Sequence, residues 1–182
     1  MSTNTIITIE RQYGSGGHLI GEKLAESLGI PFYDSELIKV AAKESGICEE
    51  IFESFLYSLV MDPYSLGYNS NSFDLPLNHK VFLAAFDTIK ELASKGPCVF
   101  VGRCADYALE DFDNCISVYV HAPFEDRIKR IENEYGIPNG KSKEMLMKKD
   151  KQRSSYYNYY SSNKWGDAKS YDLCLNSSYL GI

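Results

Sequence analysis

The sequence predicts one α/β domain, with a parallel sheet that is covered by helices on both faces. Segments typical of strands alternate with segments typical of helices along almost all of the 182 residues, and this alternation favours a parallel sheet. Two near-continuous apolar runs, CVFVG at 98–102 and CISVYVHA at 115–122, are typical of strands that are buried on both faces. A chain of this length forms one sizeable core, so a single domain over 1–182 is expected.

The first half of the chain predicts two strands and three helices. TIITIE at 5–10 is rich in β-branched residues and predicts the first strand, and IPFYD at 30–34 predicts the second. Apolar residues at helical spacing predict helices at 18–28, 35–44 and 79–95. Residues 46–80 combine two weaker helical pieces with a long polar loop, which is typical of a mobile or binding element.

The second half continues the same alternation. The two buried strands at 98–102 and 115–122 are followed by a helix after Pro123, a helix at 142–153 and a last strand at 171–176. The ligand site of such a sheet lies at the carboxyl ends of its strands.

Composition and charge exclude several kinds of protein. No apolar run approaches the roughly 20 residues that a membrane span requires, and the amino terminus lacks a signal-peptide pattern, so we expect a cytoplasmic protein with no membrane partner. The net charge of −6 argues against a nucleic-acid partner. Residues 124–153 nevertheless hold nine basic and six acidic residues, which suits either a nucleotide site or a solvated helix face. The five cysteines include no CxxC pair and are interpreted as reduced core residues, with no metal site.

A glycine-rich turn, GSGG at 14–17, separates the first strand from the first helix. Small residues let backbone amides point at an anion, and the helix that follows offers its positive amino end. The usual phosphate loop reads GxxxxGK followed by Ser or Thr. Aligned on Gly16, this chain has Arg11 in place of the first glycine, Gly17 in place of the lysine and His18 in place of the hydroxyl residue. By these residues alone, a phosphate site and a plain strand-turn-helix corner both stay open.

The glycine turn occurs together with four other segments: VGRCADYAL at 101–109, APFEDRIKRI at 122–131, KKDKQRSSYYNYY at 148–160 and WGDAKSYDLCLNSSYLGI at 165–182. In this order they resemble the cytidylate kinase-like family, a branch of the P-loop nucleoside monophosphate kinases. The resemblance is weakest at 46–80. It implies a P-loop kinase three-layer sandwich with five parallel strands in the order 2-3-1-4-5, an acceptor-binding insertion at about 35–95 and a lid at about 136–165 of the printed sequence. Related kinases would usually continue past SSYLGI into a final helix, so either a shortened chain or a shorter protein is expected.

The resemblance also implies a reaction, in which the γ-phosphoryl group of ATP passes, with Mg²⁺, to a nucleoside monophosphate such as CMP or dCMP. Small-molecule nucleotides are then the expected partners, and the protein is a monomer or a homodimer. An alternative is a nucleotide-binding regulatory protein without kinase activity, because the loop lysine is absent. A scaffold that binds protein or RNA through its aromatic, basic tail is a third reading.

The family motifs assign site residues by their positions. The ATP phosphates would be held by Gly14, Ser15, Gly16, Gly17 and His18, and the acceptor by Asp34, Ser35, Lys39, Arg103 and Asp106. The lid would contribute Arg127, Arg130, Asp150 and Arg153. The catalytic cations would be Arg103, Arg153, Arg127 and Arg11, because phosphoryl transfer needs positive charge over the phosphoryl oxygens and a planar guanidinium binds phosphate well.

Three further residue groups have more than one interpretation. Glu10 either orients a magnesium-bound water or simply ends its strand. Asp150 lies one turn before Arg153 and either binds Arg153 and holds it in place or forms only a weak surface ion pair with it. Four tyrosines at 156, 157, 159 and 160 and Trp165 either stack on a base or pack the lid against the body of the domain, and packing is favoured.

Overall fold

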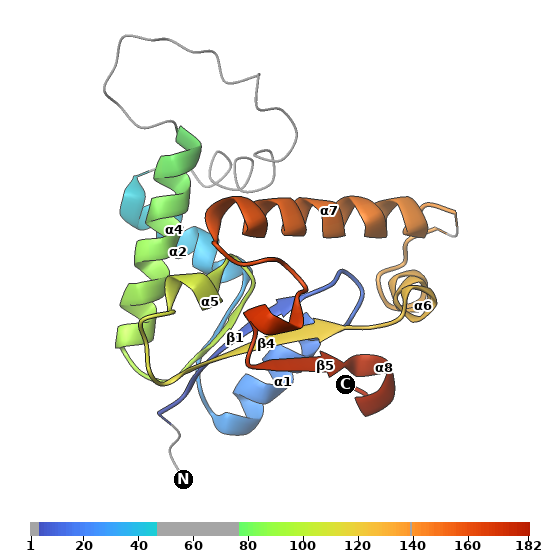
Figure 1. Cartoon of the computed structure of the whole chain (residues 1–182), viewed down its shortest axis with the longest axis horizontal. Coiled ribbons are helices and arrows are strands. Elements are labelled where there is room, and N and C mark those ends of the chain that lie inside the picture. Colours follow the sequence, from blue (N-terminus) through green and yellow to red (C-terminus); the bar gives the residue numbers. More distant parts are fainter. Residues whose placement is uncertain (1–3, 47–76, 139) are drawn as a thin grey trace.

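The computed structural model describes residues 4–46, 77–138 and 140–182 (Figure 1). Five strands form one sheet in the order β2-β3-β1-β4-β5, and every neighbouring pair is parallel. The strands are β1 Ile6–Arg11, β2 Phe32–Tyr33, β3 Val99–Val101, β4 Cys115–His121 and β5 Leu173–Asn176. The fold class and the strand order expected from the sequence are therefore confirmed.

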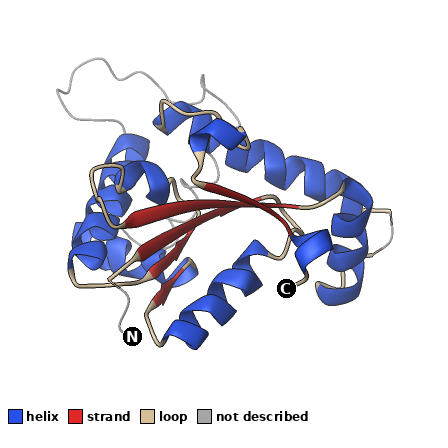
Figure 2. Ribbon diagram, turned by 60° about the horizontal axis from the view of Figure 1, so that its bottom comes forward, coloured by secondary structure: helices blue, strands red, loops and turns tan. Residues whose placement is uncertain are grey.

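Helices lie on both faces of the twisted sheet (Figure 2). They are α1 Gly17–Leu28, α2 Ser35–Ser45, α4 Leu77–Ser94, α5 Ala105–Ala108, α6 Phe124–Glu134, α7 Ser142–Tyr160 and α8 Ser177–Leu180, with a 3-10 turn, η1, at Ala168–Ser170. Apolar residues of α1 pack with Ile9, Val101 and Val118 on one face. Residues of α2, α4 and α5 pack with Ile6 and Phe100 on the other. The alternation of side chains along each strand separates these two cores.

The sequence expectation for α7 is too short. We expected a helix at 142–153, but α7 continues to Tyr160. The cause is tertiary packing, which overrides the weak helix propensity of serine and tyrosine. Tyr156 and Tyr157 are buried, and the ring of Tyr160 stacks on Phe82 of α4 with ring centroids 3.9 Å apart. These tyrosines pack as expected, whereas Tyr159 is 67% exposed.

Three short elements were not expected from the sequence: α5, η1 and α8. Elements of three or four residues show too little periodicity to be recognised. Most of the segment at 46–80, with its expected helical pieces, polar loop and Cys48, lies outside the described residues.

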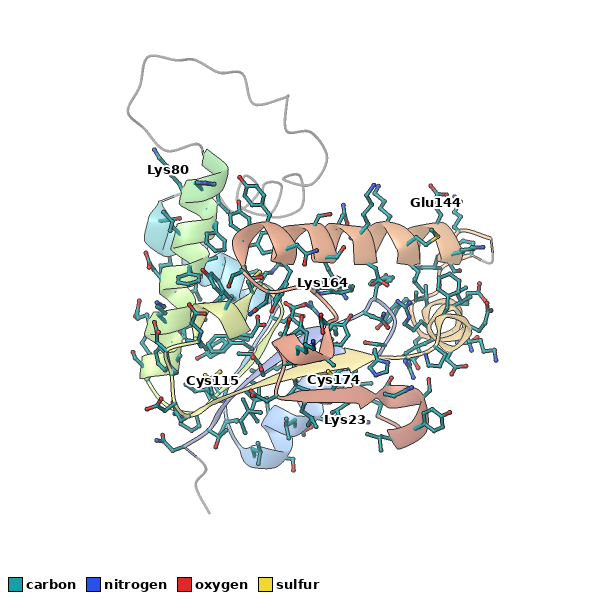
Figure 3. All side chains as sticks on the ribbon, in the orientation of Figure 1. Lys23, Lys80, Cys115, Glu144, Lys164 and Cys174 are labelled. Atoms are coloured by element: carbon teal, nitrogen blue, oxygen red, sulfur yellow. The ribbon has the colours of Figure 1, made fainter. Side chains whose placement is uncertain are left out.

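The described cysteines are Cys98, Cys104, Cys115 and Cys174, and all four are free thiols. Cys115 and Cys174 lie on the neighbouring strands β4 and β5 (Figure 3), but Cys174 pairs in register with Tyr119, so the two thiols do not face each other. Within the described ranges, no helix is both long and apolar enough to cross a membrane.

Candidate phosphate-transfer site

Two adjoining cavities lie where β1 and β3 end. The first, the loop cavity, measures about 360 Å³ and is lined by Gly14, Gly16, Gly17, His18 and Asp34, among others. The second, the cation cavity, measures about 220 Å³ and is lined by Glu10, Arg103, Lys149, Gln152, Tyr156 and Tyr157. Arg11, Tyr13 and Arg153 line both. Residues from β1, the turn after β3 and α7 therefore meet at one place, as the sequence analysis expected for the carboxyl edge of the sheet.

The glycine turn is a tight backbone turn that lines the loop cavity with Gly14, Gly16 and Gly17. Gly14 and Gly16 have φ values of 75° and 81°, and residues other than glycine rarely adopt such values. Ser15 closes the turn, because its Oγ donates to the carbonyl of Gln12 at 2.8 Å. The helix α1 then starts at Gly17, and its first amides have no acceptor one turn earlier in the helix. This amino end carries partial positive charge beside the loop cavity.

Two predicted lid arginines hold this turn from α6. Arg127 Nη1 donates to the carbonyl of Tyr13 at 3.2 Å, and Arg130 Nη1 donates to the carbonyl of Gly14 at 2.8 Å. Neither side chain lines either cavity. In this conformation both arginines position the loop backbone.

Asp150 joins α7 to the same turn. Its Oδ2 accepts from Arg127 Nη1 at 2.5 Å, and its Oδ1 accepts from the backbone amide of Tyr13 at 2.7 Å. We expected Asp150 to pair with Arg153; its two carboxylate oxygens contact Arg127 and the backbone amide of Tyr13. Arg153 donates from Nη1 to the carbonyl of Arg11 at 3.1 Å and lies over the ring of Tyr13.

The predicted acceptor residues are not all at the cavities. Asp34 lines the loop cavity, where its Oδ2 lies 2.6 Å from His18 Nδ1 and its Oδ1 lies 3.7 Å from Arg11 Nη2. Ser35 opens α2, and its side chain is outside what the structure describes. Lys39 is exposed on α2 and lines neither cavity.

Asp106 lies behind the cation cavity, not in its lining. Its Oδ2 accepts the hydroxyl hydrogen of Tyr157 at 2.5 Å. Burial, and after it the nearby carboxylate of Glu10, raise the pKa of Asp106 to about 7. The geometry makes Asp106 an anchor for α7.

Arg103 lines the cation cavity from the turn after β3, and residues of α7 line the other side of this cavity. Lys149, Gln152, Arg153 and Tyr156 line the cavity at the spacing i, i+3, i+4 and i+7, which places them on one side of a helix. Lys149 and Gln152 were not expected at the site. Both lie within the helix expected at 142–153, and Lys149 lies three residues before Gln152 and four before Arg153, so the spacing in the sequence could have identified them.

Two carboxylates are available for a magnesium ion. Glu10, which is 6% exposed, lines the cation cavity, and Asp34 lines the loop cavity. One Glu10 oxygen accepts from Trp165 Nε1 at 3.1 Å. Among the described residues there is no cluster of three His, Cys, Asp or Glu side chains that would form a complete protein cage for a metal.

Comparisons with known proteins show the family and the fold. The model of a family described as cytidylate kinase-like matches residues 6–179. The structure of an uncharacterized protein from Eubacterium ventriosum is similar, with 31% identity, a TM-score of 0.69 and coverage of 94% of this chain and 87% of that chain. No curated protein matches the chain.

Two more distant structures share the fold. A protein designated TT1252, from Thermus thermophilus, has 18% identity and a TM-score of 0.53, over 96% of this chain and 88% of that chain. Shikimate kinase from Acinetobacter baumannii, solved with shikimate, has 16% identity and a TM-score of 0.50, over 96% and 84%.

Proposed function

Because the chain belongs to the cytidylate kinase-like family, we propose that it transfers the γ-phosphoryl group of ATP to a nucleoside monophosphate, CMP or dCMP. One observation carries the proposal: the loop cavity and the cation cavity adjoin and share Arg11, Tyr13 and Arg153. The donor phosphates would lie in the loop cavity, against the amino end of α1. The acceptor phosphate would lie in the cation cavity, against Arg103.

The chemistry requires positioning and charge and no covalent nucleophile from the protein. An oxygen of the acceptor phosphate forms the new bond to the γ-phosphorus while the bond from that phosphorus to ADP breaks. Negative charge on the phosphoryl oxygens is then met by Arg103 on one side and by Lys149 and Arg153 of α7 on the other. Fixed cations in a cavity that excludes water stabilise such charge far better than water does.

Mg²⁺ accompanies ATP in reactions of this class and neutralises charge between the phosphates. It retains several waters and needs one or two carboxylates besides the phosphates themselves. Glu10 and Asp34 fit that requirement, because one carboxylate lines each cavity. Either residue would hold the ion, in part through water.

An assay of ADP release tests the proposal, with CMP, dCMP, UMP, AMP, GMP and shikimate as acceptors. Shikimate is included because a kinase of that substrate shares the fold. We expect turnover with CMP or dCMP and a loss of about 10²- to 10³-fold in kcat/KM for Arg103→Ala. Lys129→Ala is the matched control, since Lys129 is exposed on α6 and lines neither cavity. Turnover of none of the nucleoside monophosphates would remove the proposal.

A second candidate is a nucleotide-binding regulatory protein that has no kinase activity. The observation in its favour is Gly17, which stands where the usual phosphate loop has lysine. It predicts that calorimetry detects binding of ATP or CMP while the ADP-release assay detects no transfer to any acceptor.

A further inference from the structure

The side chain of Arg11 runs between two glycines. A Cβ atom added to Gly17 would lie 2.6 Å from Arg11 Cβ and 3.1 Å from Arg11 Cγ. A Cβ atom added to Gly102 would lie 1.9 Å from Arg11 Nη1. Both positions must therefore lack a side chain while Arg11 keeps this conformation.

Position 17 requires glycine because there is no room for a side chain, and not because of its backbone φ angle. Gly14, Gly16 and Gly102 have positive φ values, but Gly17 does not, so any residue could adopt its backbone conformation. A side chain at Gly17 would meet the stem of Arg11 first, and Val120 Cβ would lie 3.2 Å from the added Cβ atom.

The two departures from the GxxxxGK pattern, Arg11 and Gly17, therefore depend on each other. The pattern has glycine at position 11 and lysine at position 17, whereas this chain has Arg11 and Gly17. These residues are six apart in sequence and in contact distance in the fold. A lysine at 17 would need the space that the Arg11 stem fills, and a glycine at 11 would leave that space open.

The guanidinium of Arg11 is placed to meet an anion. Arg11 lines both cavities, and its Nε is buried with no hydrogen-bond partner among the described residues. Its Nη2 lies 3.7 Å from Asp34, which is longer than a hydrogen bond. His18 lies nearer to that carboxylate, at 2.6 Å.

We propose that Arg11 replaces the missing loop lysine by binding the outer phosphates of the donor nucleotide, and that Gly17 and Gly102 leave the space its side chain needs. This inference rests on the proposed function for the identity of the ligand, ATP. The proposed function concerns the reaction. This inference concerns which residue of the loop binds the outer phosphates, namely Arg11 in place of the lysine that the usual loop has at position 17.

Calorimetry with ATP and with AMP tests the role of Arg11. We expect Arg11→Ala to lower the affinity for ATP about 10- to 100-fold, as loss of a charged hydrogen bond does, and to leave the affinity for AMP within about threefold. A purely structural role would lower both affinities together. Unchanged affinity for ATP, or an equal loss for AMP, would overturn the proposal.

The exchanged protein, Arg11→Gly with Gly17→Lys, provides a second test, because it restores GxxxxGK. We expect its affinity for ATP to return to within about threefold of wild type. Gly17→Lys alone forces two side chains together and is expected to lower Tm or the affinity for ATP. If the exchanged protein has the wild-type Tm but binds ATP no better than Arg11→Ala, the proposal is wrong. If it does not fold, the ATP and AMP affinities of Arg11→Ala decide.

Binding is the readout, so the two proposals can fail separately. A wild-type protein that binds ATP through Arg11 but transfers no phosphoryl group contradicts the proposed function alone. A protein that turns over CMP while Arg11→Ala retains its affinity for ATP contradicts the role of Arg11 alone.

Discussion

Arg103 and Cys104 adopt a left-handed backbone that residues other than glycine rarely adopt. Their φ values are 64° and 54°, and they follow Gly102 at 74°. Each such residue costs about 1–2 kcal/mol. Complete burial of Cys104 and near-complete burial of Ala105 offset this cost. The result is a tight turn that directs Arg103 to the cation cavity from the end of β3.

Asp106, three residues further on, predicts a pH dependence of stability. Its pKa is raised from an ordinary value of 3.8 to about 7, so between these values the folded protein retains a proton that the unfolded chain has lost. The corresponding contribution to the free energy of unfolding is fully present below about pH 4 and is lost as pH rises through about 7. Asp106→Asn still accepts a hydrogen bond from Tyr157 but cannot ionise. We expect urea unfolding at pH 4, 5.5 and 7.5 to show a flatter profile for this variant, and parallel profiles would contradict the assignment.

At the scale of elements, α7 combines a binding face with an anchor. Lys149, Gln152 and Arg153 line the cation cavity, and Tyr157, further along the helix, is 1% exposed. Because one rigid helix carries both parts, the packing of its tyrosines determines where its cations lie. The anchor is therefore as important to the site as the cations themselves.

Substitutions along α7 test this anchor. Tyr157→Ala should lower the free energy of unfolding by about 3–5 kcal/mol, as other large-to-small changes of buried aromatic residues do. Tyr157→Phe removes the hydroxyl that donates to Asp106 and also interacts with Tyr171, and it should cost about 1–3 kcal/mol. Tyr159→Ala is the control, because Tyr159 is 67% exposed. Equal losses of stability for Tyr157→Ala and Tyr159→Ala in urea unfolding would refute the anchor.

At the scale of the whole molecule, segments far apart in the sequence hold the glycine turn. Arg127 and Arg130 come from α6, and Asp150 comes from α7. Ser177, at the start of α8, donates from its Oγ to the carbonyl of Ser15 at 2.6 Å. Residues from α6, α7 and α8 therefore hold the glycine turn, which does not depend on its own residues alone.

The pair of Asp150 and Arg127 is the critical link in this arrangement. The two side chains are 17% and 7% exposed, so Asp150→Ala leaves a buried cation without its acidic partner. We expect a loss of about 3–5 kcal/mol in the free energy of unfolding, together with weaker binding of ATP. The control is Glu134→Ala, since Glu134 is 51% exposed and lies 3.7 Å from Arg130; it should cost less than about 1 kcal/mol. Similar losses for both variants in urea unfolding would contradict the link.

The sequence by itself determined the fold class, the strand order through its family motifs, and the glycine turn before α1. Alternating strands and helices, and apolar runs such as 98–102 and 115–122, reflect local periodicity and burial, which are properties of neighbouring residues. The same periodicity could have revealed Lys149 and Gln152.

Only the tertiary structure decided what each charged side chain faces. Periodicity shows which residues share a side of a helix, but it carries no information about the element across from them. Three contacts all join separate elements: the ion pair of Asp150 with Arg127, the hydrogen bond from Tyr157 to Asp106 and the close approach of the Arg11 side chain to Gly17. They follow from how the sheet and helices pack, because charge and space at such a site depend on residues that the chain brings together from a distance.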